Sequence, residues 1–433
     1  MPQASDPVEQ LRTALRANDA VAAGRLLDLH PELKSRINDP VGPFDSPAIV
    51  NARSPRIIDV LVAGGADLNA KSRWWAGGFG LLHSADRKLA EYAIQRGAVV
   101  DIHAAARLDM LQRVQELIAA EPELVHARGG DGQTPLHFAS TLEIAAYLLD
   151  HGADIDACDV DHESTPAQYM IDDRQEIARF LVQRGCKTDL LMAAALGDID
   201  LVRRHLDGDP ACIRMRVTNE FFPMTSPKAG GTIYQWKLGF NLSAHRIAKK
   251  FGHADVYRLL MDRSPSEVKL LEACWLGDES TLESLGVSHA ELARKLLPTD
   301  QRQVADAARN NETDIVRSML KLGLPVDAKG QHGATPLHWA AFHGNCELVK
   351  GILPFRPPLE ATDADFHGTP LDWALHGSEH GWCACTGDYA ATVDALIQAG
   401  ARLPQQIRGT ESVLAVLRRH GMRERAGDHD PGT

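Results

Sequence analysis

Pairs of short helical patterns recur along this chain of 433 residues. Residues 190–206, LLMAAALGDIDLVRRHL, show the unit: a run of small apolar residues, a Gly-Asp turn, and a segment whose apolar residues lie three and four positions apart. This spacing predicts two helices, each with one apolar face. Because one pair alone cannot bury both faces, successive pairs must stack on each other. The pattern therefore predicts an all-α chain built as a solenoid.

The first helix of several pairs opens with the same four residues, TPLH. Residues 133–157 read QTPLHFASTLEIAAYLLDHGADIDA, and residues 334–361 read ATPLHWAAFHGNCELVKGILPFRPPLEA. The threonine caps the helix, and the proline takes the first helical position, where its missing N–H costs nothing. Glycine after the second helix, as at Gly152, suits the left-handed conformation of a C-cap. These segments resemble the ankyrin repeat, which has a period of about 33 residues; degenerate copies begin at Ser164, Val304 and Gly368.

The resemblance implies an ankyrin-repeat solenoid of about twelve helix pairs over residues 1–420. It also implies that the loop before each first helix, here called a finger, projects toward the concave face of the stack. The last residues, 421–433, carry no apolar face, and we expect them to be disordered. The overall combination is similar to ankyrin-repeat proteins of bacteria.

Three insertions interrupt the repeats. The first, near residues 71–80, reads KSRWWAGGFG; the second, near residues 213–242, contains FFPMTSPKAGGTIYQWKLG; the third, near residues 376–390, reads HGSEHGWCACTGDYA. The first two occupy finger positions, and the third lies between the two helices of a pair, so we do not expect it to share their surface. About five repeats, at roughly 10 Å per helix layer, separate the first two, so separate sites are the default. The second insertion spans nearly thirty residues and, if largely extended, could reach the first, so the sequence leaves open whether the two form one site.

Aromatic residues gather in the two finger insertions. Rings at finger tips are exposed to water unless something covers them. Either they fold back onto neighbouring fingers as a local core, or they line a binding groove. The candidate binding residues of this kind are Trp74, Trp75, Phe79, Phe222, Tyr234 and Trp236.

Polar finger residues form a second set of candidates: Asp161, His162, His332, Asp365 and His367. Aspartate beside histidine can orient and charge an imidazole for acid–base chemistry, whereas finger aspartates are also common turn formers. The histidines at the fourth position of the TPLH opening, His137 and His338, are a different case, and His83 in LLHSA resembles the same position in a degenerate copy. We expect those side chains to bond the backbone of a neighbouring loop and to take no part in catalysis.

The third insertion has the spacing HxxxHxxCxC, which invites a zinc assignment. This spacing matches no structural zinc motif, and CxC is a poor source of two ligands from one short turn. We therefore expect no metal site there. Phosphate-binding loops and nucleophile elbows are also missing from the sequence, which predicts no cofactor.

Composition narrows the class of protein. With a net charge of −12, the chain lacks the excess of basic residues that is typical of a nucleic-acid-binding protein. There is no apolar run of about 18 residues, and the opening residues MPQASDPVEQ do not resemble a secretion signal, so we expect a soluble cytoplasmic monomer without membrane association. Seven cysteines, an odd number, favour a reducing compartment over a disulfide scaffold.

Two functions fit these observations. The resemblance implies a recognition scaffold that binds a partner protein through the concave surface of fingers and first helices. The alternative is an enzyme or small-molecule-binding protein whose pocket is built by the aromatic insertions and the finger histidine and aspartate residues. The sequence leaves open whether the chain catalyses a reaction.

Overall fold

The computed structural model describes residues 6–285 and 288–422, and within these ranges the chain is helical, with no β-strand. The prediction of an all-α chain of helix pairs is confirmed. The predicted disordered tail lies almost entirely outside the described residues. None of the described helices has the length and apolar character needed to cross a bilayer. All seven cysteines are free thiols.

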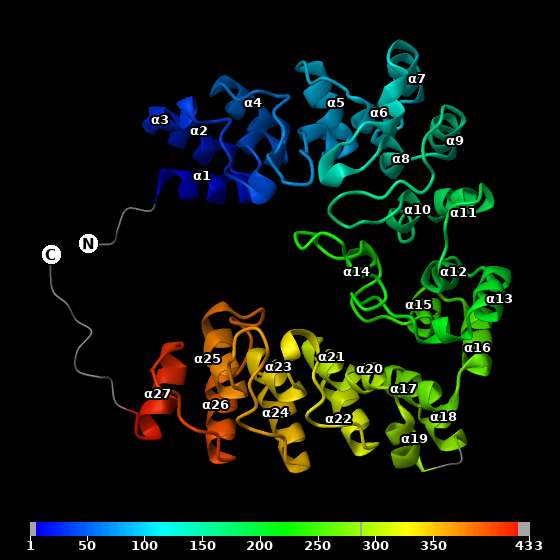
Figure 1. Ribbon diagram of the computed structural model, residues 1–433. Coiled ribbons are helices and arrows are strands. Elements are labelled where there is room, and N and C mark those ends of the chain that lie inside the picture. The colour runs from blue at the N-terminus through cyan, green and yellow to red at the C-terminus, as the bar shows by residue number, and fades with distance from the viewer. Residues whose placement is uncertain (1–5, 286–287, 423–433) are drawn as a thin grey trace. The chain divides into compact units, whose positions relative to one another are not determined.

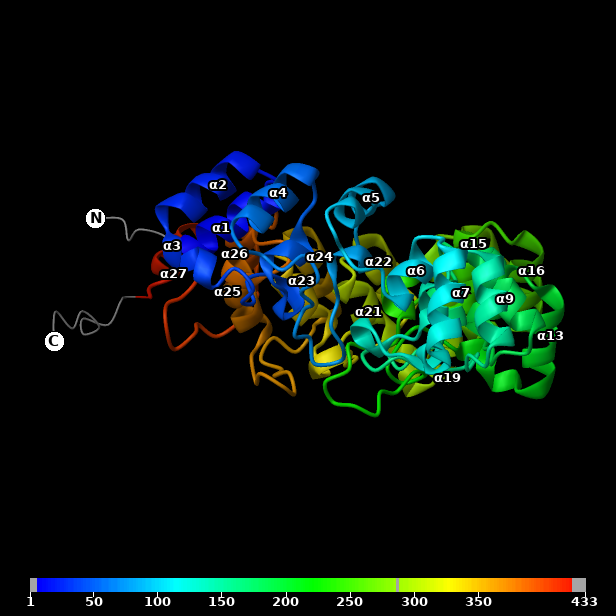
Figure 2. The same cartoon turned by 90° about the horizontal axis from the view of Figure 1, so that it is seen from above.

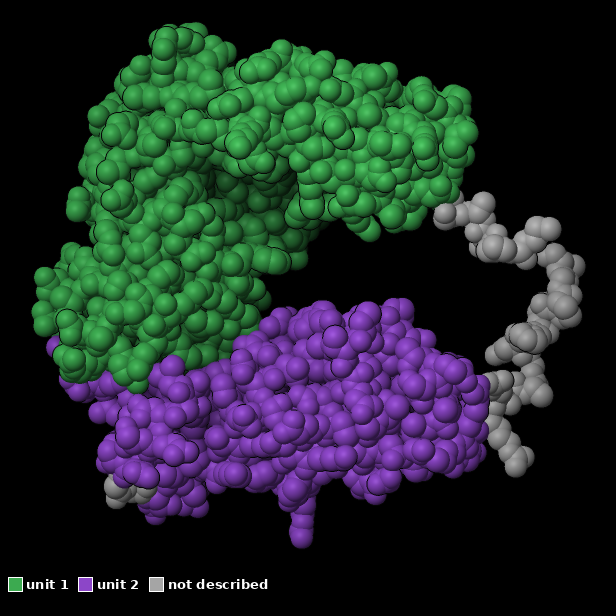
Figure 3. All heavy atoms as spheres, turned by 180° about the vertical axis from the view of Figure 1, so that it is seen from behind, with its two compact units in different colours: residues 1–260 green, residues 261–433 purple. Residues whose placement is uncertain are grey.

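The chain divides into two compact units, residues 1–260 (unit 1) and residues 261–433 (unit 2), which Figure 3 colours separately. The helices of unit 1 are α1 (Pro7–Arg16), α2 (Ala20–Leu29), α3 (Pro31–Ser35), α4 (Pro55–Ala63), α5 (Arg87–Gln95), α6 (Ile102–Arg107), α7 (Leu111–Ala120), α8 (Pro135–Phe138), α9 (Leu142–Asp150), α10 (Pro166–Tyr169), α11 (Gln175–Gln183), α12 (Leu190–Leu196), α13 (Ile199–Gly208), α14 (Tyr234–Lys237), α15 (Ala244–Lys250) and α16 (Ala254–Arg263), the last of which contains the boundary.

The helices of unit 2 are α17 (Ser266–Leu276), α18 (Glu279–Ser284), α19 (His289–Lys295), α20 (Pro298–Gln301), α21 (Gln303–Arg309), α22 (Thr313–Lys321), α23 (Pro336–Phe342), α24 (Cys346–Ile352), α25 (Pro370–His380), α26 (Tyr389–Gln398) and α27 (Glu411–Arg419). Short 3-10 helices occupy the loops: η1 (Pro43–Asp45), η2 (Ala48–Asn51), η3 (Leu81–His83), η4 (Pro122–His126), η5 (Gly130–Gly132), η6 (Pro210–Arg214), η7 (Gln331–Gly333) and η8 (Leu353–Phe355).

The pair α12 and α13 shows how the sequence determines one repeat. The Asp189 carboxylate accepts the backbone N–H of Met192 and caps α12, all of whose residues are buried. Gly197 ends that helix with a φ of 65°, a left-handed conformation that glycine adopts without strain. The carboxylate of Asp198 then caps α13. Small apolar residues in the first helix let neighbouring pairs approach closely, so the pairs from α6 to α16 bury a shared apolar core.

First helices pack against first helices within each unit. In unit 1, α6 lies against α8, and α12 lies against α15; in unit 2, α23 lies between α21 and α25 (Figures 1 and 2). The fingers and the first helices therefore share one side of each unit. Of the three insertions, the first lies before η3, the second lies before α15, and the third joins α25 to α26.

The histidines of the two TPLH openings have the predicted structural role. His137 accepts the Thr134 backbone N–H at Nδ1 (3.1 Å), and its Nε2 donates to the Ser164 carbonyl (3.1 Å). His338, fully buried, makes the same two bonds, with Thr335 (3.1 Å) and with Gly368 in the next finger (3.1 Å). Each ring therefore joins one repeat to the following one.

Candidate functional site

An aromatic pocket of about 360 Å³ lies on the finger side of unit 2. Its walls come from two fingers, from α23 and α25, from the third insertion, and from the segment before α27. The lining residues are His332, Trp339, Phe342, Phe366, Gly368, Asp372, Trp373, His376, Trp382 and Arg408. We call this the aromatic pocket.

Two buried tryptophans form the floor of the pocket. Trp339 and Trp373 follow the openings TPLH and TPLD at the same position of consecutive repeats. Their ring centres lie 5.0 Å apart at an interplanar angle of 85°, an edge-to-face contact. The Trp373 indole N–H donates to Oδ2 of Asp363 (2.9 Å), a finger aspartate whose carboxylate also accepts three backbone N–H groups and so forms the turn. Both rings are thus fixed by packing, and that of Trp373 also by a hydrogen bond.

Two large aromatic side chains at the rim remain exposed. Phe366 is 68% exposed and Trp382, from the third insertion, is 63% exposed. The Trp382 ring stacks on Trp339 (5.9 Å between centres, 25°), and the Arg309 guanidinium lies over both rings, 5.3 Å and 5.6 Å from their centres. Exposed aromatic area around a hollow is typical of binding surfaces.

The polar groups of the pocket are held in place. Asp372 stands where TPLH has its histidine; Oδ2 accepts the backbone N–H (3.0 Å) and hydroxyl (2.8 Å) of Thr369, and Oδ1 pairs with Arg408 (3.3 Å). Burial lowers the pKa of His376, and the neighbouring His380 and Arg408 lower it further. The pocket therefore presents imidazole side chains and a paired carboxylate within an apolar wall.

The polar candidates of unit 2 divide between the pocket and the finger tip. His332 lines the pocket, and its Nδ1 lies 2.7 Å from Oδ2 of Asp365 in the next finger. Asp365 is exposed outside the lining, and His367 is an exposed tip residue with a φ of 55°. Sequence reasoning missed the tryptophans of the floor, although their recurrence at one position of two consecutive repeats is a usable signal.

The third insertion does not gather its histidines and cysteines. The rings of His376 and His380 lie 5.0 Å apart, whereas Sγ of Cys383 lies 3.6 Å from Nδ1 of His343, and Cys385 is exposed. Among the described residues, no three of these ligand atoms converge.

The first insertion folds back onto neighbouring loops of unit 1. An isolated bridge between Lys71 and Gly80 closes its base. The ring of Trp74 meets Phe44 edge-on (5.0 Å between centres), and Phe79 lies so close to Gly130 that a Cβ there would come within 2.3 Å of its ring. Trp74 and Phe79 are half-buried as a result. Of the two interpretations given above, a local core and a binding groove, these contacts favour the local core.

The second insertion packs on the finger before α10. Tyr234 is fully buried, and its hydroxyl donates to Oδ2 of Asp189 (3.0 Å), so this candidate lies in the core and not on a binding surface. Phe222 meets the Tyr234 ring edge-on (5.4 Å). Trp236 remains 72% exposed, and Figure 1 shows α14 on the side of the first helices.

The two finger insertions meet, a question that the sequence left open. Nζ of Lys228 in the second insertion lies 6.0 Å from the centre of the Trp75 ring, and Trp75 is 37% exposed. The long second insertion therefore reaches the first along the fingers, although several helix layers separate the two in the stack. Asp161 and His162 lie buried beneath this second insertion.

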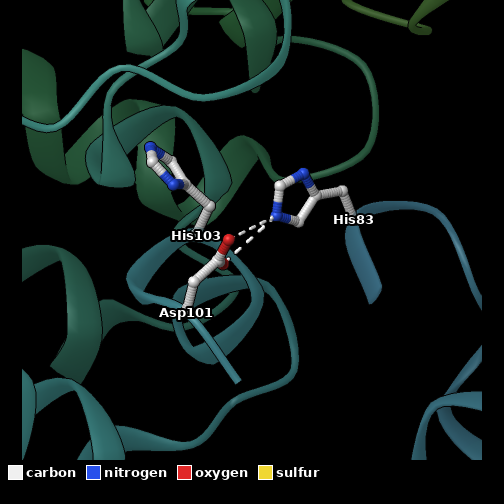
Figure 4. A group of neighbouring side chains, drawn as sticks. All are labelled: His83, Asp101 and His103. Carbon is white, nitrogen blue, oxygen red and sulfur yellow. Dashed lines mark hydrogen bonds and ion pairs between the residues drawn. The ribbon is translucent and has the colours of Figure 1, made fainter. Parts of the chain in front are cut away.

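His83, Asp101 and His103 form a polar group in unit 1 (Figure 4). His83 accepts the Gly80 backbone N–H at Nδ1 (3.2 Å), so its Nε2 carries the proton and donates to Asp101 (3.0 Å). Lys71 also pairs with Asp101 (2.9 Å). Burial lowers the pKa of His103 to about 4. The Asp101 charge is matched within the chain. His83 differs from the prediction, because its Nε2 bonds the side chain of Asp101 in the next repeat and not the backbone of a neighbouring loop.

Comparisons with known proteins agree with this architecture. Residues 102–192, 270–363 and 305–407 match the family model for ankyrin repeats, and together they span more than half of the chain. The chain is 34% identical over 92 residues to the E3 ubiquitin-protein ligase XB3 of Oryza sativa subsp. japonica, an alignment that covers 21% of this chain and 20% of the rice protein.

A smaller relative is matched over most of its own length. The Notch-regulated ankyrin repeat-containing protein of Xenopus laevis is 30% identical over 100 residues, covering 22% of this chain and 82% of that protein. The human protein of the same name is 31% identical over 83 residues, covering 18% of this chain and 73% of its own. With its stacked helix pairs, the histidines of its TPLH openings and these matches, the chain belongs to the ankyrin-repeat family.

Proposed function

We propose that this chain is a recognition protein that binds a segment of a partner protein in the aromatic pocket of unit 2. The observation that carries the proposal is the exposure of Phe366 and Trp382 at the rim of a hollow whose floor is fixed. Rigid aromatic groups in a pocket are where binding energy concentrates at protein interfaces. The segment we expect carries an apolar or aromatic side chain that enters the pocket.

The family supports a protein partner, since ankyrin repeats are in general scaffolds for protein–protein interaction. The match to the rice ubiquitin ligase covers a fifth of that protein, and its ligase activity is not part of the proposal. A small-molecule ligand is the second candidate, because a volume of about 360 Å³ falls within the usual range of ligand pockets, about 300–1,000 Å³.

Selection from a displayed peptide library, followed by fluorescence titration, tests the proposal. Peptides selected on the full chain should bind Trp382→Ala about 30-fold more weakly, since an interfacial tryptophan typically contributes about 2 kcal/mol and about 1.4 kcal/mol is tenfold. Trp236→Ala is the matched control, because it removes an equally exposed tryptophan from unit 1. Equal affinity of all three proteins would refute the proposal.

A further inference from the structure

Asp131, Asp161 and His162 bring three potential ligand atoms within 4.8 Å of one another in unit 1. Asp131 is at the tip of the finger before α8, in η5, and the other two are in the finger before α10. The Asp131 carbonyl accepts the backbone N–H groups of Val160 (2.7 Å) and Asp161 (3.2 Å), which fixes one finger against the next. The group is therefore built by two adjacent repeats.

His162 is oriented as a metal ligand would be. Its side chain is buried, with 8% of the residue exposed, and Nδ1 lies 2.7 Å from the Gly231 carbonyl, which can only accept. Nδ1 therefore carries the proton of the neutral ring, and Nε2 presents its lone pair. Nε2 makes no hydrogen bond and lies 3.7 Å from Oδ2 of Asp161. A backbone carbonyl on the second ring nitrogen is the usual support of a metal-bound histidine.

The two carboxylates lack a cation. Oδ1 of Asp131 is shielded from solvent and makes no hydrogen bond of normal geometry, although the Trp74 indole N–H is a neighbouring donor. Within the described chain, no lysine or arginine forms an ion pair with Asp131 or Asp161. One oxygen of each carboxylate lies within 4.8 Å of the other, so the two negative charges repel each other. A positive charge at this point would relieve the repulsion.

Two other groups in the chain are complete without an ion. In the His83 group, Lys71 pairs with the carboxylate, and the histidine nitrogen that faces it carries a proton. In unit 2, the positions of Asp131, Asp161 and His162 are taken by His332, Asp365 and Phe366. The His332 imidazole there bonds the Asp365 carboxylate directly at 2.7 Å.

We infer that Asp131, Asp161 and His162 form a binding site for one divalent transition-metal ion. Two carboxylates and an imidazole suit Zn²⁺ or Mn²⁺, and three protein ligands leave a position for water. Because the Gly231 carbonyl supports His162, a bound ion joins two fingers and the second insertion. The aromatic rings of the two insertions then lie over fingers that the bound ion holds together.

Zinc binding to the full chain tests the inference. After chelation and removal of the chelator, isothermal titration should show one zinc ion per chain that Asp131→Asn no longer binds, with an affinity loss of at least tenfold. Asparagine has the same shape and tolerates the φ of 55° at this position. The variant should therefore fold, and without metal it should melt at the same or a higher temperature than the parent. Zinc should raise the melting temperature of the parent alone.

Asp365→Asn serves as the control, since it makes the same Asp-to-Asn change in unit 2, at the finger position that corresponds to Asp161, and should leave zinc affinity unchanged. Two results would overturn the inference: no zinc bound by the parent at micromolar concentration, or equal zinc affinity in the parent and in Asp131→Asn. Titrations with Mn²⁺ and Ca²⁺ in place of Zn²⁺ then rank the three ions by affinity. A site that prefers Ca²⁺ would contradict the transition-metal assignment.

Discussion

Nζ of Lys228 lies 6.0 Å from the centre of the Trp75 ring, so the second insertion reaches the first along the fingers of unit 1. A cation over an exposed aromatic ring contributes about 0.5–1 kcal/mol. Such a contact is too weak to organise the loops by itself. The stability of the two packed insertions must therefore come from the half-buried aromatic rings beneath this contact. The contribution of each ring can be measured by a single substitution.

Trp74→Ala should destabilise the chain far more than Trp236→Ala. Trp74 packs edge-on against Phe44, whereas Trp236 is 72% exposed. We expect a loss of roughly 2–4 kcal/mol in the free energy of unfolding for the first variant, because truncating a packed tryptophan leaves a cavity. The second should change it by less than about 0.5 kcal/mol. Urea denaturation followed by circular dichroism measures both, and equal losses would mean that the first insertion has no local core.

His338→Ala should lower the free energy of unfolding by about 1–3 kcal/mol, since it leaves the Thr335 N–H and the Gly368 carbonyl without their partner. His367→Ala is the control, because that histidine is exposed at a finger tip of the same unit. Thermal melting of both variants, with peptide affinity measured beside it, checks the assignment. Full stability of His338→Ala together with lost binding would show a functional residue instead.

The stability of the metal-free chain relative to Asp131→Asn should depend on pH. The pKa of Asp131 is raised from 3.8 to about 6 in the folded protein, chiefly by burial. The folded state then binds this proton more tightly than the unfolded state, so the stabilisation is present below about pH 4 and is lost as the pH rises through about 6. We expect the parent to lose stability relative to the variant across this interval. Urea titrations in chelator at several pH values measure the difference, and a constant difference would contradict the raised pKa.

Replacing Cys383 and Cys385 by serine should leave the zinc stoichiometry of the chain unchanged. Sγ of Cys383 lies beside His343, and Cys385 is exposed, so the two thiols do not converge with His376 and His380 on one point. Elemental analysis of the parent and the double variant after zinc loading and desalting checks this. Loss of one zinc ion per chain would place a metal in the third insertion after all.

The repeats were predictable because their signals are local. A threonine cap, a proline at the first helical position and a glycine after the second helix each act within a few residues, and His338 could be assigned from its place in TPLH alone. The aromatic candidates were harder to place. Tyr234 and Trp236 are two residues apart in one insertion, yet one is fully buried and the other mostly exposed. A loop without periodicity gives no indication of which side chain turns inward.

The pocket and the polar group of unit 1 depend on contacts between repeats. Asp131 reads as an ordinary turn residue in GGDGQ, and its closeness to His162 follows only from the stacking of two fingers. Trp382 likewise reaches Trp339 through the turn between α25 and α26. Such juxtapositions depend on loop conformations that a single sequence does not specify.

One bond between adjacent fingers uses backbone atoms alone and recurs in both units. The Asp131 carbonyl accepts the Val160 N–H (2.7 Å) in unit 1, and the His332 carbonyl accepts the Ala364 N–H (2.7 Å) in unit 2. Side chains at the tips are therefore free to vary without loosening the joint between repeats. The same backbone arrangement of two fingers already occurs twice in the chain with different side chains at the tips. The paired changes His332→Asp and Phe366→His would give unit 2 the ligand atoms of unit 1. Residues at the finger tips can thus be substituted while the helix stack stays the same, and new ligand specificities can arise from such substitutions.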